Sequence, residues 1–259
     1  MHKADISENI EPEVNKDSAI YLGFGSQTGI ENMETDAEMA RLTALDSISR
    51  FRFYTWSPWA ISLGANQSKD NFDSDKLKEN GIHLVRRPTG GRAVYHAEEL
   101  TYCVTVPSDS SEKNRKIYEA IHIAIAKGLA NCSILTDFER NNPDFKNHYG
   151  KEISASCFSS SARYELKKEG KKYVGSAQRA YSNVLLQHGS ILIGSEHLNI
   201  VDYMDFGKDD SETETKKSRL KAVLADSSTQ INSFIEKSLS PEELSNMLIP
   251  EFENALSQF

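Results

Sequence analysis

The most informative stretch of the sequence is Arg86-Arg87-Pro88-Thr89-Gly90-Gly91-Arg92, which has the composition of a loop. Short apolar runs that predict strands stand on both sides of it. Gly90 and Gly91 let backbone N–H groups approach a ligand that a side chain would hold away. The arginines suit a phosphate or a carbonyl oxygen. The same residues also suit a glycine turn flanked by solvated arginines, and the residues alone leave both interpretations open.

Apolar runs upstream of this loop predict strands separated by amphipathic helices. Residues 32–47 predict a helix whose N-cap is Asn32. Ser57-Pro58 is typical of a turn, so we expect the strands on its two sides to pair with each other. The spacing of the glycines within residues 23–29 differs by one residue from the G-x-G-x-x-G motif of dinucleotide-binding turns, so we interpret them as loop glycines. The other expected elements are strands at 19–22, 51–56, 60–63 and 82–85 and a short helix at 74–80, with Ser74 as its N-cap.

Elements downstream of the loop follow in an order that indicates an α+β fold. Apolar residues at helical spacing predict a helix over residues 112–130. Residues 164–175 have the pattern of a β-hairpin around Lys168-Glu169-Gly170. Residues 209–217 predict a charged connector before two helices, the second of which begins at Ser240-Pro241. Strands are expected at 93–95, 100–106, 184–186 and 190–193, so strands come in antiparallel clusters with helices between them.

Composition narrows the class of protein. The chain has 259 residues and a net charge of −8, which disfavours nucleic-acid binding because that affinity comes mainly from neutralised phosphates. Its three cysteines show neither metal-ligand spacing nor a disulfide framework, so we expect no metal and a reducing compartment. The sequence shows no N-terminal leader and no apolar run of membrane length, which predicts a cytoplasmic protein that does not bind a membrane.

Cys157 is the best candidate nucleophile among the cysteines. It lies in a run of small and polar residues, 154–161, that is typical of an accessible turn. The second strand of the predicted hairpin can return Lys172 toward this turn, where an ammonium group favours the thiolate. The alternative interpretation is that Cys157 is an exposed cysteine without an activating partner and that Lys172 is a solvated surface lysine. His96, at the end of the strand after the glycine loop, is likewise more often structural than catalytic.

Four motifs make the chain resemble the superfamily of lipoate–protein ligases and octanoyltransferases, which shares a fold with the catalytic domain of biotin–protein ligases. They are residues 86–96, Lys172 through Gln178, Gln187-His188-Gly189-Ser190, and Asn32-Met33 with Asp36. The resemblance covers about residues 18–205 and implies mixed, largely antiparallel sheets flanked by helices. Together with the polar composition of the first residues and the change to charged residues near 208, it predicts a flexible lead-in at 1–17, a catalytic domain at 18–207 and a C-terminal helical extension at 208–259.

Within the superfamily the chain resembles octanoyltransferases of the LipM type. Arg92 stands where ATP-dependent ligases have a third glycine, and Cys157-Phe158 fills the place of the family's Cys-Phe pair. The resemblance implies that Cys157 carries an acyl thioester and that Lys172 is the motif lysine. Ala97 follows His96 where the family often has aspartate, which leaves the hydrogen-bond partner of His96 open. The implied substrate-binding residues are Arg86, Arg87, Gly90, Gly91, Arg92, His96, Gly175, Ser176, Ala177, His188 and Gly189.

The function that this resemblance implies is transfer of an octanoyl group from acyl carrier protein, through the cysteine thioester, to the lysine of a lipoyl domain. The acceptors would be E2 subunits of 2-oxoacid dehydrogenases or the glycine cleavage H protein. Conversion of a thioester into an amide is downhill, so no cofactor is expected. The alternatives are an ATP-dependent lipoate–protein ligase acting through lipoyl-AMP, a relay of octanoyl between two lipoyl domains, and a non-enzymatic protein that binds an acyl chain or a carrier protein.

Overall fold

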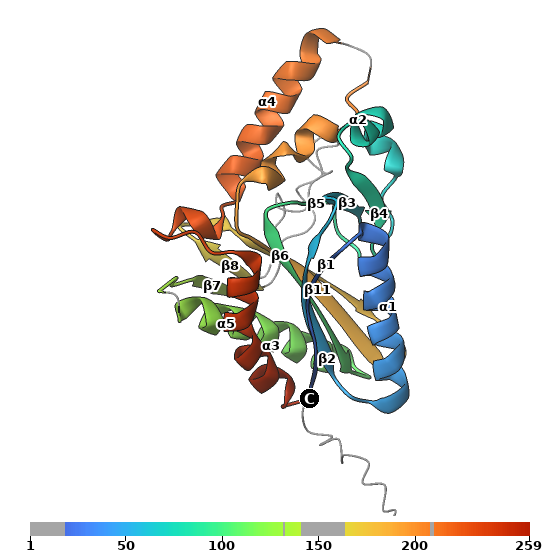
Figure 1. The fold of residues 1–259 in the computed structure, drawn as a ribbon, viewed down its shortest axis with the longest axis vertical. Coiled ribbons are helices and arrows are strands. Elements are labelled where there is room, and N and C mark those ends of the chain that lie inside the picture. The colour runs from blue at the N-terminus through green and yellow to red at the C-terminus, as the bar shows by residue number, and fades with distance from the viewer. Residues whose placement is uncertain (1–18, 132, 141–163, 208–209) are drawn as a thin grey trace, which may run out of the picture.

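The computed structural model describes residues 19–131, 133–140, 164–207 and 210–259 and shows an α+β fold built on a five-stranded sheet (Figure 1). Parallel pairing joins the first two strands of that sheet, and antiparallel pairing joins the others. The strand order is β1 (Ile20–Gln27), β2 (Arg50–Trp56), β6 (Glu99–Pro107), β11 (Val184–Leu192) and β10 (Val174–Ala180).

Two three-stranded sheets complete the architecture, and one of them carries the glycine loop. The first has the order β4 (His83–Arg86), β3 (Ala60–Leu63) and β5 (Val94–His96). The second has the order β7 (Asp137–Arg140), β8 (Tyr164–Lys168) and β9 (Lys171–Lys172). Residues 87–93 connect β4 to β5. The sheets are mixed and largely antiparallel, which confirms the predicted fold class.

Helices cover both faces of the large sheet (Figure 1). Helix α1 (Gly29–Asp46) packs on one face, whereas α3 (Ser111–Ala130) and α5 (Pro241–Leu256) lie on the other. Side chains along β2 point alternately to the two faces of the sheet. Phe51 and Phe53 contact Phe252 of α5 on one face. Arg52 and Tyr54 bond to Asp36 of α1 on the other face. The remaining elements of the described residues are α2 (Ser74–Glu79), α4 (Asp210–Ser227) and the 3₁₀ segments η1 (Lys69–Asn71), η4 (Glu196–Tyr203) and η5 (Ile231–Ser233).

The predicted pairing across Ser57-Pro58 is wrong. β2 pairs with β1 and β6, so both of its edges are occupied, and β3 instead joins β4 and β5 in another sheet. The predicted hairpin at 164–175 is confirmed, because β8 and β9 are antiparallel and Glu169 and Gly170 both have positive φ, at 53° and 77°. Such a turn suits the right-handed twist of a two-stranded ribbon.

Several predicted boundaries are wrong for local reasons. The N-cap of α1 is Thr28, which forms a capping box with Glu31, so Asn32 lies inside the first turn and is fully buried. Asp73, not Ser74, caps α2. β1 continues through Gly23 and Gly25, which were interpreted as loop glycines, and Gly23 has a φ of +98° where the pairing register shifts.

Two further segments are more regular than their composition indicated. The predicted strands at 184–186 and 190–193 are one strand, β11, that runs through Gly189. The predicted connector is helical from Asp210 onward as the start of α4, where ion pairs Lys216–Glu212 and Lys217–Glu214 join successive turns. None of the helices in the described part of the chain combines the length and apolarity needed to cross a membrane.

Helix α5 packs into the core of the large sheet, although it follows the predicted boundary at residue 207. Its buried residues Leu244, Leu248 and Phe252 share one hydrophobic cluster with residues of β2, β6 and α3. Gly128 of α3 permits this contact, because a Cβ atom there would lie 2.6 Å from Leu248 Cδ2. The domain boundary itself stays a prediction.

Replacement of Leu248 by alanine is expected to lower the free energy of unfolding by about 2–5 kcal/mol, since it empties a site between α3 and α5. Urea denaturation followed by circular dichroism measures the loss. Leu45→Ala on α1 is the matched control, because that side chain is 72% exposed and its loss should change stability little. Equal losses in the two variants would contradict the packing described for α5.

Candidate functional site

A cavity of about 360 Å³ lies where the large sheet meets the small β4-β3-β5 sheet. The apolar part of its lining consists of Met33, Tyr54, Trp56 and Val94. The remaining lining residues are Ser62, Arg87, His96, Thr101, Gly175, Ser176, Ala177, His188, Gly189 and Ser190.

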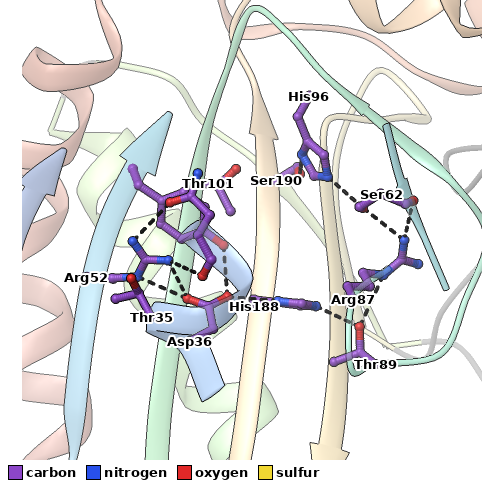
Figure 2. A network of polar contacts seen from close by, with 12 residues as sticks. Thr35, Asp36, Arg52, Ser62, Arg87, Thr89, His96, Thr101, His188 and Ser190 are labelled. Carbon is purple, nitrogen blue, oxygen red and sulfur yellow. Dashed lines mark hydrogen bonds and ion pairs between the residues drawn. The ribbon is translucent and has the colours of Figure 1, made fainter. Parts of the chain in front are cut away.

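Asp36 of α1 is the buried charge beside this cavity (Figure 2). Its Oδ1 accepts hydrogen bonds from Arg52 Nε and Nη2 at 3.0 and 2.7 Å, and its Oδ2 accepts one from the Tyr54 hydroxyl at 3.0 Å. His188 Nδ1 lies 3.3 Å from Oδ2. Burial alone would raise the pKa of Asp36, but the hydrogen bond from His188 and the charge of Arg52 outweigh it, so the pKa lies below its usual value.

His188 connects Asp36 to the glycine loop through hydrogen bonds at its two ring nitrogens. Burial lowers the pKa of His188 more than the Asp36 carboxylate raises it, so the imidazole is neutral. Its Nδ1 proton faces the carboxylate, which makes Nε2 the acceptor for the Thr89 hydroxyl at 2.7 Å. The same hydroxyl accepts a hydrogen bond from Arg87 Nε at 3.2 Å.

Arg87 is buried and directs its guanidinium group at its own loop. Its Nη2 donates to the carbonyl oxygens of Gly90 and Arg92 at 2.9 and 2.6 Å. Its Nη1 donates to the carbonyl and the hydroxyl of Ser62 at 2.9 and 3.1 Å. These contacts fix the shape of the loop, because a single rigid, planar guanidinium group bonds to several of its carbonyl oxygens and to β3 at the same time.

His96 continues the network on the far side of Ser62. Its Nε2 lies 2.7 Å from Ser62 Oγ, its Nδ1 lies 2.6 Å from Glu99 Oε1, and its ring stacks on Trp56 at 4.0 Å. Glu99 therefore supplies the carboxylate partner that Ala97 does not. The same Glu99 oxygen also accepts hydrogen bonds from the hydroxyls of Thr101 and Ser190.

A second polar group lies at the β10 side of the cavity. Ser176 Oγ lies 2.7 Å from the Tyr102 hydroxyl and 3.2 Å from His122 Nε2. His122 is buried on α3, and its Nδ1 faces the Tyr118 carbonyl oxygen at 2.8 Å. Burial lowers the pKa of His122 to about 4, against a weaker opposing effect of that carbonyl, so the ring is neutral near pH 7.

The structure brings seven of the predicted site residues together around the cavity. These are Arg87, His96, Gly175, Ser176, Ala177, His188 and Gly189. Arg86 is exposed and donates to the carbonyl oxygens of Gly64 and Ala65, and Lys172 lies buried on β9, outside the lining. Gly90, Gly91 and Arg92 form the loop beside the cavity. Cys157 lies outside the described residues, so its role and that of Lys172 stay predictions.

The loop glycines differ in what the backbone requires of them. Gly91 has a φ of +91°, a conformation that favours glycine, and its carbonyl oxygen lies where a Cβ of Gly64 would stand. Open space surrounds the position of a Cβ at Gly90. Gly189 is needed for close packing, because its Cβ would lie 2.7 Å from both Ser176 Oγ and Tyr102 Cε1.

Several residues of the site were not predicted from the sequence. Asp36 had been matched to a family motif without a role, and Glu99 follows another glutamate, Glu98, at the start of an apolar strand. His122 interrupts the apolar stripe of α3, which was a usable signal for a buried polar contact. Within the described ranges, no three histidine, cysteine, aspartate or glutamate side chains gather as a metal site would require.

Asp36→Asn is expected to lower the free energy of unfolding by about 3–5 kcal/mol, because it leaves the buried Arg52 guanidinium without a counter-charge. Thermal or urea denaturation at neutral pH measures it. Glu38→Gln removes an exposed ion pair with Arg41 on the same helix and should leave stability unchanged. A mild effect of the Asp36 substitution would contradict the described charge pairing.

Acidification from pH 6.5 to about 4 is expected to destabilise the protein partly through His122. The folded pKa is about 4 and the ordinary value is 6.5, so the unfolded chain takes up the proton first. Stability is complete above 6.5, and the loss from this residue reaches about 3 kcal/mol near pH 4. His122→Gln should flatten the pH dependence of the unfolding free energy, whereas the same change at exposed His83 should leave its slope intact.

Comparison with known proteins places the chain in a family. The sequence profile of the lipoyl protein ligase A/B catalytic domain matches residues 29–253. An octanoyltransferase LipM of Staphylococcus epidermidis is 35% identical over 243 residues, covering 91% of this chain and 83% of the relative. Another, from Lysinibacillus sphaericus, is 34% identical over 201 residues, covering 74% of this chain and 70% of the relative.

A solved structure shares the fold. It is a bi-partite lipoate protein ligase studied with its E2 lipoyl domain from Thermoplasma acidophilum, and it aligns with a TM-score of 0.69 at 19% identity. The alignment covers 92% of this chain and 84% of that one. With a profile match over most of the chain and relatives above 30% identity, the chain belongs to the lipoyl protein ligase A/B catalytic domain family.

Proposed function

We propose that the protein is an octanoyltransferase of protein lipoylation. It takes an octanoyl group from acyl carrier protein onto Cys157 and passes it to the lysine of a lipoyl domain. The observation that carries the proposal is the match, over 91% of the chain, to a relative that is itself an octanoyltransferase. The acceptors would be E2 subunits or the glycine cleavage H protein, and we place the reaction in the cytoplasm.

The lining of the cavity suits an acyl chain with a reactive carbonyl at one end. Met33, Trp56 and Val94 supply apolar surface for the hydrocarbon. Polar groups of Ser62, Thr101 and other residues converge on the same space. A mostly apolar pocket with a few placed polar groups binds such a ligand because burial of the chain drives binding and the polar groups fix its orientation.

The covalent step begins with the Cys157 thiolate. It attacks the carbonyl carbon of the donor thioester, a new C–S bond forms, and the carrier leaves with its sulfur as a thiolate that takes up a proton. Lys172 favours the attacking thiolate through its charge. Its backbone is held on both sides, by Lys167 across the β8–β9 pair and by the Thr229 N–H at 2.9 Å. No cofactor takes part in this proposal.

An adenylating ligase is the alternative, and the hydrogen bonds that Arg87 already makes within the protein disfavour it. That reaction needs cationic groups for the phosphate of an acyl-adenylate. The guanidinium group of Arg87 is already directed at the carbonyl oxygens of its own loop and at Ser62. A relay between two lipoyl domains uses the same chemistry as the main proposal and differs in its donor.

Incubation with octanoyl–acyl carrier protein and an apo lipoyl domain, without ATP, is expected to octanoylate the domain. Intact-mass spectrometry of the enzyme should show one octanoyl adduct, which Cys157→Ala abolishes. Cys103→Ala is the matched control, because that thiol is buried in the hydrophobic core and its loss should leave the adduct in place. Undiminished adduct in Cys157→Ala refutes the thioester, and transfer that needs ATP and free lipoate favours the ligase.

A further inference from the structure

Arg87 is the arginine that lines the cavity, and every N–H of its guanidinium group already has an acceptor within the protein (Figure 2). Nε donates to the Thr89 hydroxyl, and Nη1 donates to the carbonyl and hydroxyl oxygens of Ser62. Nη2 donates to the carbonyl oxygens of Gly90 and Arg92. A guanidinium group has five N–H donors, so these five bonds leave none for a ligand.

The Ser62 hydroxyl gives its proton to His96. A carboxylate only accepts, and Glu99 Oε1 lies 2.6 Å from His96 Nδ1, so the proton of the neutral ring is on Nδ1 and Nε2 is an acceptor. Ser62 Oγ lies 2.7 Å from that Nε2 and accepts from Arg87 Nη1 at 3.1 Å. A hydroxyl has one proton and two lone pairs, so Ser62 has one lone pair left for the cavity.

Two more hydroxyls of the lining direct their protons at the same carboxylate. Thr101 Oγ1 donates to Glu99 Oε1 at 2.6 Å and accepts from the indole N–H of Trp56 at 2.8 Å. Ser190 Oγ donates to Glu99 Oε1 at 3.0 Å. Thr101 and Ser190 both line the cavity, so what they offer a ligand is a lone pair and not a proton.

The other polar side chains of the lining also direct their protons away from the cavity. The Tyr54 hydroxyl donates to Asp36 Oδ2 at 3.0 Å, and the Nδ1 proton of His188 faces the same oxygen. Ser176 Oγ lies 3.2 Å from His122 Nε2. That nitrogen is an acceptor, because the Nδ1 proton of His122 is directed at a backbone carbonyl oxygen of α3, so the Ser176 proton goes to Nε2.

The described side chains around the cavity therefore present lone pairs to a ligand, with their own protons committed elsewhere. An N–H or O–H group of a ligand can donate to those lone pairs. A carboxylate has only lone pairs and a negative charge, and it meets a guanidinium group whose donors are all in use. It would lose its water without gaining hydrogen bonds from these side chains, which makes its burial costly.

We infer that the cavity selects uncharged compounds that join an apolar chain to an N–H or O–H group, and that it excludes the carboxylate of a free fatty acid. The inference rests on the proposed function, which supplies the octanoyl chain as the occupant. An octanoyl amide, the kind of product that the proposed transfer forms, has the N–H that these lone pairs accept. Octanoate, which hydrolysis of an octanoyl thioester releases, neither occupies the cavity nor competes for it.

The test measures the affinity of the full chain for three ligands with the same chain by isothermal titration calorimetry at pH 8, where an imidazole is neutral. Octanamide is expected to bind about tenfold more tightly than methyl octanoate, the equivalent of one hydrogen bond. Octanoate should bind about a hundredfold more weakly than octanamide, because its charge stays unpaired. Octanoate that binds as tightly as octanamide, or an ester that matches the amide, overturns the inference.

His96→Phe tests the assignment of protons through a gain of binding. Phenylalanine keeps an aromatic ring against Trp56 but removes the acceptor of the Ser62 proton, which is then available to a ligand. Affinity for octanoate should rise about tenfold, and adding Ser62→Ala to the same chain should cancel the rise. Misfolding does not produce such a gain. A folded His96→Phe variant without the gain overturns the inference, and if that variant does not fold, the ligand ranking of the unaltered chain decides.

His197→Phe is the matched control, because that histidine is also buried and bonds to Ser228 Oγ at 2.8 Å but does not line the cavity. Its affinities for the three ligands should equal those of the unaltered chain, and the same gain for octanoate there overturns the inference. Failure of the proposed function gives a different result. The expected ranking in a chain that acquires no octanoyl group from the carrier protein supports the inference and refutes the function.

Discussion

The Asp36 carboxylate, buried without access to water, is the constraint on which the site depends. An unpaired charge in that position would cost several kcal/mol, so the fold must bring donors to it. It does so from distant parts of the chain: Arg52 and Tyr54 from β2, and His188 from β11, 152 positions from Asp36. The pairing that satisfies the charge thus fixes α1 against two strands of the large sheet.

The same constraint reaches the glycine loop through hydrogen bonds. His188, which is hydrogen-bonded to Asp36, also bonds to the Thr89 hydroxyl, and that hydroxyl accepts a hydrogen bond from Arg87. The guanidinium group of Arg87 in turn donates to a carbonyl oxygen of the loop, at Gly90. His96 then joins Ser62 to Glu99 on the next wall of the cavity. The side-chain hydrogen bonds in this series are buried, so displacing one side chain leaves its neighbours unsatisfied, and this cost holds the cavity in one shape.

Helix α3 has an analogous role on the other side of the cavity. One of its carbonyl groups holds the Nδ1 proton of His122, and so makes Nε2 the acceptor of the Ser176 proton. Helix α5 presses α3 against the sheet at Gly128, where a larger residue would collide with Leu248. The C-terminal helix therefore contributes to the site through packing, although none of its residues lines the cavity.

The sequence determined much of the fold and part of the site. Periodicity placed α3, β6 and the β8–β9 hairpin, and the motif resemblance identified the family and seven residues that line the cavity. Periodicity depends only on residues that are close in sequence, and the resemblance depends on short motifs in a fixed order along the chain. The sequence did not reveal that β3 leaves β2 for another sheet, because strand periodicity shows which side chains are buried and not which edge pairs.

Only the tertiary structure decided the partners of the buried polar groups. Glu99 replaces the aspartate that His96 lacks at position 97, and His122 on α3 meets Ser176 on β10. The first contact spans only three positions and depends on the turn between β5 and β6, whereas the second joins residues 54 positions apart. A buried donor takes whichever acceptor the packed chain places within about 3 Å, and that neighbour is set by the crossing of helices and strands distant in sequence.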